Sequence, residues 1–382
     1  MSYDLAVIGA GPAGSSAARI AAKKGLKVAL IDRRKKPGTP KQCAEGINAE
    51  AFRFLGMKPK KDWISNNISS CMGSNINGSV CIERPGTKGF ILERKVFDLA
   101  LVNMALDAGA ENFFGHSATK IRGTNLKEIQ IGNKTIKAKA IVAADGPSGS
   151  VARMIGHTPV RNGIGMQYEI KGSFTNSHSL QAYVSKRIID GGWAWVFPKK
   201  NTLNVGIGSF NPTNLKPKLD AFVKKIGLNK NKILEVNGGL IPLHGPISQI
   251  YKDNVLFVGD AAGHTNPVSG GGIPASMFDG KLAAEVVADE LSNSKPNFSN
   301  YQIKWNESPW KSAMDKSLRV QKFFLEYLHN GSFDYTLDRI GHQKVYRKRD
   351  MFKFVTKVPS IKAGIDYIRY GFMYYKPYKY AW

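Results

Sequence analysis

Residues 9–14 read Gly-Ala-Gly-Pro-Ala-Gly and stand between an apolar run that predicts a strand and an alanine-rich segment that predicts a helix to about residue 24. Glycines permit a tight turn there and let a pyrophosphate approach the free amides of the helix N-terminus. A second apolar run closes on Asp32, whose carboxylate can accept hydrogen bonds from ribose hydroxyls. The pattern predicts a dinucleotide site. Its expected contacts are Gly9, Gly11, Pro12, Ala13, Gly14, Asp32 and Arg33. Arg33 and Arg34 could suggest a 2′-phosphate, but loop solvation explains them equally well.

Two further turns follow apolar strands farther along the chain. Residues 143–146 read Ala-Ala-Asp-Gly, and residues 258–262 read Val-Gly-Asp-Ala-Ala. Together with the first turn, they resemble the FAD-binding oxidoreductases of the aromatic-hydroxylase superfamily. The resemblance implies FAD as the cofactor and places Gly259 and Asp260 at its ribityl half. Asp145 suits a direct cofactor contact and a helix N-cap equally well.

Two helix starts extend the resemblance. Residues 267–273 lead into a long helix, whose free amides and dipole favour negative charge. The resemblance implies that the backbones of Gly271, Gly272 and Ile273 meet the pyrimidine edge of the flavin near N1 and O2. Arg94 begins a segment similar to the superfamily's Arg-x-x-Phe-Asp helix start, whose arginine contacts the cofactor; an ordinary surface arginine is the alternative. Ala118 is a further contact that the resemblance implies.

Two segments are similar, more narrowly, to geranylgeranyl reductases, especially the archaeal enzymes that saturate isoprenoid chains of membrane lipids. Residues 41–47 resemble that family's Lys-x-Cys-x-x-Gly loop beside the flavin, which implies that Cys43, Ala44 and Gly46 contact the cofactor. Residues 193–198 read Trp-Ala-Trp-Val-Phe-Pro and precede a Gly-Ile-Gly at 206–208. They resemble the family's Tyr-x-Trp-x-Phe-Pro and Gly-x-Gly pattern, with Trp193 in place of the tyrosine.

Alternation along this strand places Trp193, Trp195 and Phe197 on one face. These rings could wall a tunnel for a polyprenyl chain, and ordinary sheet core is the alternative. Cys43 is the residue expected at the reacting bond. A nearby Lys41 would favour its thiolate, whereas inert packing against the flavin is the alternative.

Positioning these residues requires an α/β fold. The pattern of runs and helices predicts a Rossmann-like nucleotide-binding domain over 1–60, 90–160 and 246–295, and the resemblance implies that this domain binds FAD. An antiparallel-sheet substrate domain over 61–89 and 161–245 interrupts it, and a helical region over 296–382 follows.

The chain of 382 residues carries 55 Lys and Arg against 29 Asp and Glu, a formal charge of +26. We expect an anionic partner. An anionic membrane surface is favoured over nucleic acid, since no zinc spacing, RNP-type motif or helix-turn-helix pattern is present; a basic surface that merely suits its source is the alternative. Three cysteines without metal spacing and no signal-peptide pattern favour a cytoplasmic setting. No run approaches the roughly 18 to 20 apolar residues that span a bilayer, so we expect any membrane contact to be peripheral.

Residues 366–382 mix basic and aromatic side chains and are a candidate membrane-binding tail. The alternative is a helix packed over the sheet. The residues concerned are Arg369, Tyr370, Phe372, Tyr374, Tyr375, Lys376, Tyr378, Lys379 and Trp382.

The resemblance implies an FAD-dependent reductase that saturates C=C bonds of geranylgeranyl lipid chains with hydride from flavin N5. A menaquinone chain or geranylgeranyl diphosphate is an alternative substrate. A flavin-dependent halogenase or hydroxylase and a non-catalytic prenyl carrier are alternative classes. The electron donor, ferredoxin or NAD(P)H, is left open because no second nucleotide motif is visible.

Overall fold

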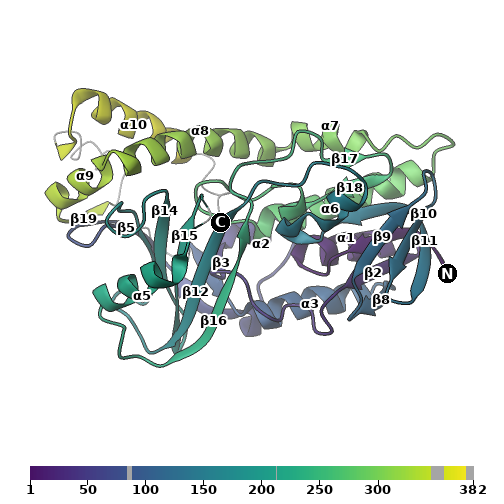
Figure 1. Cartoon of the computed structure of the whole chain (residues 1–382), viewed down its shortest axis with the longest axis horizontal. Coiled ribbons are helices and arrows are strands. Elements are labelled where there is room, and N and C mark those ends of the chain that lie inside the picture. Colours follow the sequence, from purple (N-terminus) through teal and green to yellow (C-terminus); the bar gives the residue numbers. More distant parts are fainter. Residues whose placement is uncertain (84–87, 212, 346–356, 376–382) are drawn as a thin grey trace.

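The structure is a computed structural model that describes residues 1–83, 88–211, 213–345 and 357–375. It confirms the α/β class. One sheet has the strand order β17-β18-β11-β1-β2-β8, with the β9–β10 hairpin attached to β11 (Figure 1). Its strands are β1 (Ser2–Ile8), β2 (Val28–Asp32), β8 (Glu111–Phe114), β9 (Ala118–Arg122), β10 (Lys127–Ile131), β11 (Lys134–Ala143), β17 (Tyr251–Lys252) and β18 (Val255–Phe257).

The core of this sheet is parallel, with β1 paired to β2 and β11, and β11 paired to β18. Parallel strands end at the same edge of a sheet, and ligands bind beyond that edge. The turns after β1, β11 and β18 carry the three motifs found in the sequence. The topology therefore brings together segments that lie more than a hundred residues apart.

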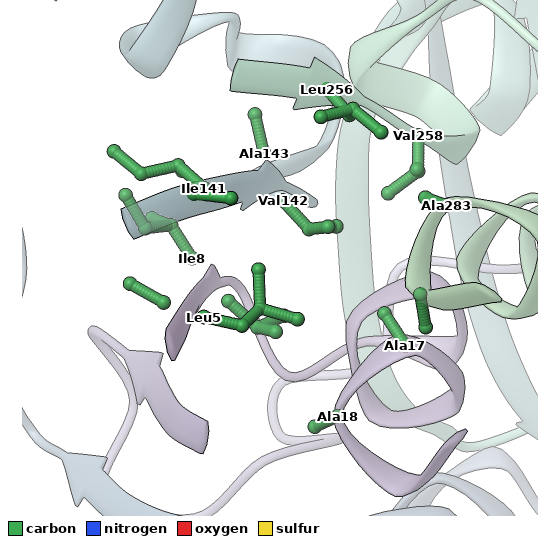
Figure 2. Close-up of a cluster of buried hydrophobic side chains, with 14 of the residues drawn as sticks. Leu5, Ile8, Ala17, Ala18, Ile141, Val142, Ala143, Leu256, Val258 and Ala283 are labelled. Atoms are coloured by element: carbon green, nitrogen blue, oxygen red, sulfur yellow. The ribbon is translucent and has the colours of Figure 1, made fainter. Parts of the chain in front are cut away.

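Three helices pack with this sheet around one hydrophobic core: α1 (Pro12–Lys23), α3 (Arg94–Leu106) and α6 (Ile273–Leu291). Small side chains let α1 and α6 approach closely; Figure 2 shows Ala17 and Ala283 between them, beside the buried strand residues Val142 and Leu256. A Cβ at Gly280 of α6 would lie 2.0 Å from the carbonyl oxygen of Ala13. This packing fixes the start of α1 against α6.

The second sheet has the order β16-β12-β15-β14-β13-β5-β6-β19. Most neighbours are antiparallel as expected, but β13 pairs with β5 and β19 pairs with β6 in parallel. Its strands are β5 (Ser70–Ser74), β6 (Ser79–Glu83), β12 (Gly163–Lys171), β13 (Ser179–Tyr183), β14 (Gly192–Pro198), β15 (Thr202–Ser209), β16 (Ile233–Ile241) and β19 (His342–Val345). Helix α5 (Leu215–Lys225) covers one face.

A third, small sheet joins the other two. It has the order β3-β7-β4, with β3 (Gly46–Asn48), β4 (Ile64–Ile68) and β7 (Gly89–Leu92), and the short helix α2 (Ala49–Phe54) follows β3. β4 falls within 61–89, a segment that we expected in the substrate sheet. It pairs with β7 instead, since both strands bury residues around Phe52, Trp63 and Phe97.

The C-terminal region is helical, as expected, but it also supplies β19 to the second sheet. Its helices are α7 (Asn300–Glu307), α8 (Pro309–His329), α9 (Ser332–Ile340) and α10 (Ile361–Tyr375). Figure 1 shows α8 running along both halves of the molecule. Within the described residues, no helix is both long and apolar enough to cross a membrane.

Candidate active site

Two cavities meet at the edge where the parallel strands end. The first has a volume of about 390 Å³ and the second, between this edge and the second sheet, about 460 Å³. They share as wall residues Pro12, Gln42, Gly239, Leu240, Asp260 and Ser276. Of the expected cofactor contacts, the first cavity is lined by Gly9, Gly11, Pro12, Ala13, Asp32, Arg33, Ala118, Asp145 and Asp260. The second is lined by Pro12, Cys43, Ala44, Gly46, Arg94, Asp260, Gly271, Gly272 and Ile273.

The three glycines of the first turn do different work. Gly9 has φ +105°, and a Cβ there would lie 2.1 Å from the carbonyl oxygen of Ala144. A Cβ at Gly14 would lie 1.8 Å from the carbonyl oxygen of Gly9. At Gly11, by contrast, a Cβ would meet nothing within 4 Å, and this residue faces the cavity. Gly14 lines neither cavity, so its role is the close packing of helix on strand.

Asp32 is held in place by its neighbour Arg34, for which the sequence left a 2′-phosphate contact and loop solvation equally open. The Ala10 N–H donates to Asp32 Oδ2 at 2.8 Å, and the Arg34 guanidinium donates to both carboxylate oxygens at 2.9 and 2.8 Å. Burial works to raise the pKa of Asp32, but its hydrogen bonds and attraction to Arg34 outweigh this and hold the pKa below the ordinary value. The carboxylate is thus ionised and oriented before any ribose arrives.

Asp145 hydrogen-bonds to the first turn of the next α-helix, although Gly149 holds the N-cap position. Its Oδ2 accepts hydrogen bonds from Ser150 Oγ at 2.6 Å and the Val151 N–H at 3.0 Å, at the start of α4 (Ser150–Met154). Its Oδ1 is buried, has no partner among the described residues, and belongs to a residue that lines the first cavity. An orphaned acceptor at this wall fits a ligand hydroxyl.

The Gly259–Asp260 turn is supported from below by a buried pair that the sequence reasoning missed. The Gly259 N–H donates to Asp279 Oδ2 at 3.0 Å, and His264 Nδ1 hydrogen-bonds to the same oxygen. The His264 ring stacks on Trp305 of α7. Gly259 itself lines neither cavity. Asp260 lines both, accepts a hydrogen bond from Thr265 Oγ1 at 2.6 Å, and has its pKa raised by burial.

The start of α6 and the Arg94 side chain close the wall beside the second cavity. Gly272 is the N-cap of α6, and no acidic residue lies in the first helical turn, although a Cβ on Gly272 would lie 3.3 Å from Asp260 Oδ1. Arg94 is no surface arginine, because its side chain is only 13% exposed. Its guanidinium donates to Asp98 at 2.7 and 2.8 Å. Burial works to lower the pKa of Arg94, but the attraction of Asp98 and Glu45 and the hydrogen bonds to Asp98 outweigh it and raise the pKa, so Arg94 stays cationic.

Cys43 lies in the cavity wall, but the expectation of a Lys41-activated thiolate is wrong. Lys41 donates to Glu45 and Glu169 instead. Burial raises the pKa of the Cys43 thiol, an effect that Arg94 only partly offsets. The Glu45 N–H lies 3.2 Å from Cys43 Sγ. Cys43 is therefore a neutral thiol at neutral pH.

A buried charge cluster fastens the Cys43 loop to the second sheet. Glu45 adopts φ +72° and its Oε2 accepts from Lys41 Nζ at 3.0 Å and Lys199 Nζ at 3.1 Å. Lys199 also reaches Glu93 at 3.0 Å and Glu169 at 3.5 Å. The side chains of Lys41, Glu45 and Lys199 are almost completely buried. Ions this deep in the protein persist only when each is paired.

Two amides complete the attachment of the loop. Gln167 on β12 and Asn204 on β15 both donate to the Cys43 carbonyl oxygen, at 2.9 and 3.2 Å. Neither amide belongs to a motif found in the sequence. Gln167 stands between apolar neighbours on a strand, and that position could have indicated a buried polar residue. The loop conformation is thus set from the second sheet.

The aromatic strand lines the second cavity. Trp193, Trp195 and Phe197 share one face of β14, while Ala194 and Val196 pack into the core on the other. A Cβ at Gly206 would lie 2.1 Å from the Trp195 ring and one at Gly208 would lie 3.2 Å from the Trp193 ring, so the Gly-x-Gly pattern makes room for the indoles. The Trp195 Nε1–H donates to Asn204 at 2.9 Å. Sequence reasoning missed further lining residues on the neighbouring strands β13 and β5, in the segment after β13 and on α8, namely Cys71, Met72, Leu180, Ala182, Val184 and Phe324.

These residues fit an FAD. A glycine turn with one open position, an oriented carboxylate and an orphaned acceptor line the first cavity, and a helix N-terminus opens on the second. The family model for FAD dependent oxidoreductases matches residues 4–205, and a lycopene cyclase protein model matches residues 204–336.

Curated relatives narrow the family. Digeranylgeranylglycerophospholipid reductase 2 of Methanopyrus kandleri is 32% identical, with 96% of this chain and 98% of the relative aligned. Digeranylgeranylglycerophospholipid reductase 1 of Methanosphaera stadtmanae is 35% identical, with 93% of each chain aligned. The chain belongs to the digeranylgeranylglycerophospholipid reductase family. The match to the FAD dependent oxidoreductase model agrees with this assignment: the protein is a flavin-dependent oxidoreductase, and its cofactor is FAD.

Solved structures agree with this family. A geranylgeranyl bacteriochlorophyll reductase-like protein from Thermoplasma acidophilum superposes with a TM-score of 0.83 at 25% identity, covering 96% of this chain and 98% of its own. A flavin-dependent brominase superposes with a TM-score of 0.65 at 18% identity, covering 89% of this chain and 93% of its own. The second likeness shows a shared fold alone.

Proposed function

We propose that this protein saturates isolated C=C bonds in the geranylgeranyl chains of archaeal-type glycerophospholipids. Membership of the reductase family supports the reaction. The single structural observation that carries the proposal is the aromatic-walled cavity, which opens beside the α6 N-terminus and the Cys43 loop. An apolar chain would be buried there against Trp193, Trp195 and Phe197.

We assign the cofactor contacts by cavity. Gly9, Gly11, Asp32 and Arg33 would hold the ADP half, and Asp260 the ribityl chain. The Gly271–Ile273 backbone and Arg94 would meet the flavin end. FAD, when bound and reduced, supplies a hydride from N5. Positive charge at the α6 N-terminus favours the anionic reduced form.

The chain's own residues supply the rest of the chemistry. Reduction adds a hydride to one alkene carbon and a proton to the other, and an isolated alkene offers no conjugated group to help. The apolar wall excludes water from the reacting bond. Cys43 keeps its proton because burial raises its pKa, so it can hold a proton at Sγ beside the substrate. A thiol is a weak acid, which makes its exact placement by the Glu45 cluster important.

Replacing Cys43 by alanine or serine is expected to leave FAD bound and to lower alkene reduction at least about tenfold, because a proton-holding group leaves the wall. Single-turnover reoxidation of reduced flavin by a geranylgeranyl lipid measures the loss. Cys71→Ala is the matched control, since Cys71 lines the same cavity but belongs to β5 of the second sheet and not to the Cys43 loop. Turnover that stays at the wild-type rate in Cys43→Ala would remove Cys43 from the chemistry.

The function itself is tested by an anaerobic experiment. Purified protein should be yellow, and after reduction its flavin should be reoxidised by a digeranylgeranylglycerophospholipid without oxygen, yielding a product heavier by two hydrogens per bond. Reduced ferredoxin and NAD(P)H, supplied in parallel, identify the electron donor. Flavin that reoxidises only with oxygen, and a lipid of unchanged mass, would instead support a halogenase or hydroxylase.

A further inference from the structure

β16 is an unusual edge strand. It pairs with β12 on one side and with no described strand on the other. Free edges are normally protected by charge, because exposed apolar edges associate with other surfaces. On β16, however, Leu234 and Val236 are 45% and 57% exposed and line neither cavity, whereas Leu240, which is 48% exposed, lines both cavities. The side chains of Leu234 and Val236, together with the half-buried Ile164 and Met166 on the neighbouring strand β12, form what we call the apolar strip.

The two faces of β16 differ. Glu235 and Asn237 alternate with the strip, and Glu235 binds Lys95 of α3 while Asn237 and Gly239 line the second cavity. The Gln42 side chain donates to the Gly238 carbonyl oxygen at 3.0 Å, which ties the strand to the Cys43 loop. β16 therefore leads directly from the apolar strip into the cavity wall.

Positive charge gathers on the same side of the sheet. Helix α5 packs on this face through Leu219 and Phe222, which contact the cluster that contains Tyr168 and Ile170 of β12. Between residues 215 and 232, which include α5 and the loop that leads into β16, there is one acidic residue, Asp220. The lysines of this segment are Lys216, Lys218, Lys224, Lys225, Lys230 and Lys232. Figure 1 shows α5 beside β12 at this end of the second sheet.

We propose that the apolar strip and the lysines of residues 215–232 form the surface by which this protein docks on an anionic lipid bilayer. Apolar side chains insert at the headgroup boundary and lysines attract anionic headgroups, so the two act together. A second copy of this chain is a poorer partner, because a symmetric contact would bring two sets of these lysines together. The inference rests on the proposed function in one respect: a bilayer at β16 would hold the lipid substrate next to the cavity that uses it.

This surface differs from the basic, aromatic tail expected from the sequence. Residues 376–382 and several side chains before them lie outside the described residues. Of the described part, Tyr367 and Tyr370 of α10 pack on Phe323 of α8, so these two rings are engaged within the protein. Ile361 and Ile365 of α10 are 85% and 60% exposed and offer a matched control surface.

The test is flotation of the holoprotein with vesicles of phosphatidylcholine alone or with phosphatidylglycerol added. Leu234→Thr with Val236→Thr should reduce binding to the anionic vesicles at least about tenfold, given the apolar area removed. Lys224→Gln with Lys225→Gln, Lys230→Gln and Lys232→Gln should reduce it to the level seen with neutral vesicles. The control pair Ile361→Gln with Ile365→Gln should bind like the wild type. Flavin absorbance and melting temperature verify that each variant is folded.

Three results would overturn the proposal. The first is that the Leu234 and Val236 variant binds vesicles like the wild type. The second is that only the α10 control variant loses binding. The third is that the Leu234 and Val236 variant changes from dimer to monomer by light scattering while its vesicle binding stays the same. The last would assign the surface to a second copy of the chain. Turnover of detergent-dispersed lipid is measured separately. If the wild type shows no such turnover, the proposed reductase function is wrong. The docking surface is judged from vesicle binding alone.

Discussion

Gly14→Ala is expected to destabilise the protein by about 3 kcal/mol or more and to yield material that retains little FAD. The added Cβ would sit 1.8 Å from the Gly9 carbonyl oxygen and 3.1 Å from the Ala144 Cβ. Backbone atoms cannot step aside as a flexible side chain can, so α1 must move away from the turn after β1. That movement spoils both the core and the phosphate-binding amides. Thermal unfolding and the flavin-to-protein absorbance ratio measure the two effects.

Gly11→Ala is the matched control for Gly14→Ala. A Cβ at Gly11 meets no protein atom within 4 Å, but it projects into the first cavity. The melting temperature of the apoprotein should therefore stay near that of the wild type, while FAD affinity falls because the methyl group occupies space needed by the cofactor. A Gly11 variant as unstable as Gly14→Ala would contradict this division of roles.

Lys199→Met is expected to cost about 3 to 5 kcal/mol of stability and most of the turnover. The substitution removes one of the two lysines that pair with Glu45. It also leaves Glu169 with Lys41 as its remaining lysine partner among the described residues. A buried carboxylate that loses its partner must distort, hydrate or take up a proton. Because Glu45 belongs to the Cys43 loop, turnover should fall even where FAD remains bound. Chemical denaturation, flavin content and single-turnover reduction are measured together.

Lys24→Met is the control for Lys199→Met, since Lys24 pairs with Asp289 at the surface and its loss should change stability by less than about 1 kcal/mol. A double variant gives a sharper test of function. If Lys199 acts through Cys43, Lys199→Met should lower turnover little further in a Cys43→Ala background. Fully additive losses would show that the cluster supports the fold and not the thiol.

The cluster also predicts a pH dependence. Burial tends to raise the pKa of Glu169, but hydrogen bonds from Lys41 and Thr202 and the attraction of Lys199 lower it below 4.5. A carboxyl group whose pKa is lower in the folded protein than in the unfolded chain stabilises the fold at any pH above its unfolded-state pKa. This stabilisation is lost as the pH falls towards the folded-state pKa. The stability difference between wild type and Lys199→Met should thus be largest near neutral pH and shrink below about pH 4.5. A difference that stays constant down to pH 3 would exclude an ionic origin.

Local sequence predicted much of the cofactor site. Turns such as 9–14 and 258–262 contain glycines with positive φ, +105° at Gly9 and +56° at Gly259, and the resemblance of these turns to those of FAD-binding oxidoreductases pointed to a flavoprotein. The two-residue period of β14 likewise placed Trp193, Trp195 and Phe197 on one face, because a strand's alternation is independent of what surrounds it. Geometry of this kind is local, and a sequence shows it directly.

Tertiary structure alone decided which distant residues serve these motifs. Lys199 neutralises Glu45 across 154 positions of sequence, and Asp279 supports the Gly259 turn from within α6. The pKa of Cys43 depends on burial, so a neighbouring lysine in the sequence predicted the wrong charge state. Such pairings arise when the whole chain closes around a core, where desolvation makes each buried charge find a partner. Spacing along the chain carries no record of that requirement.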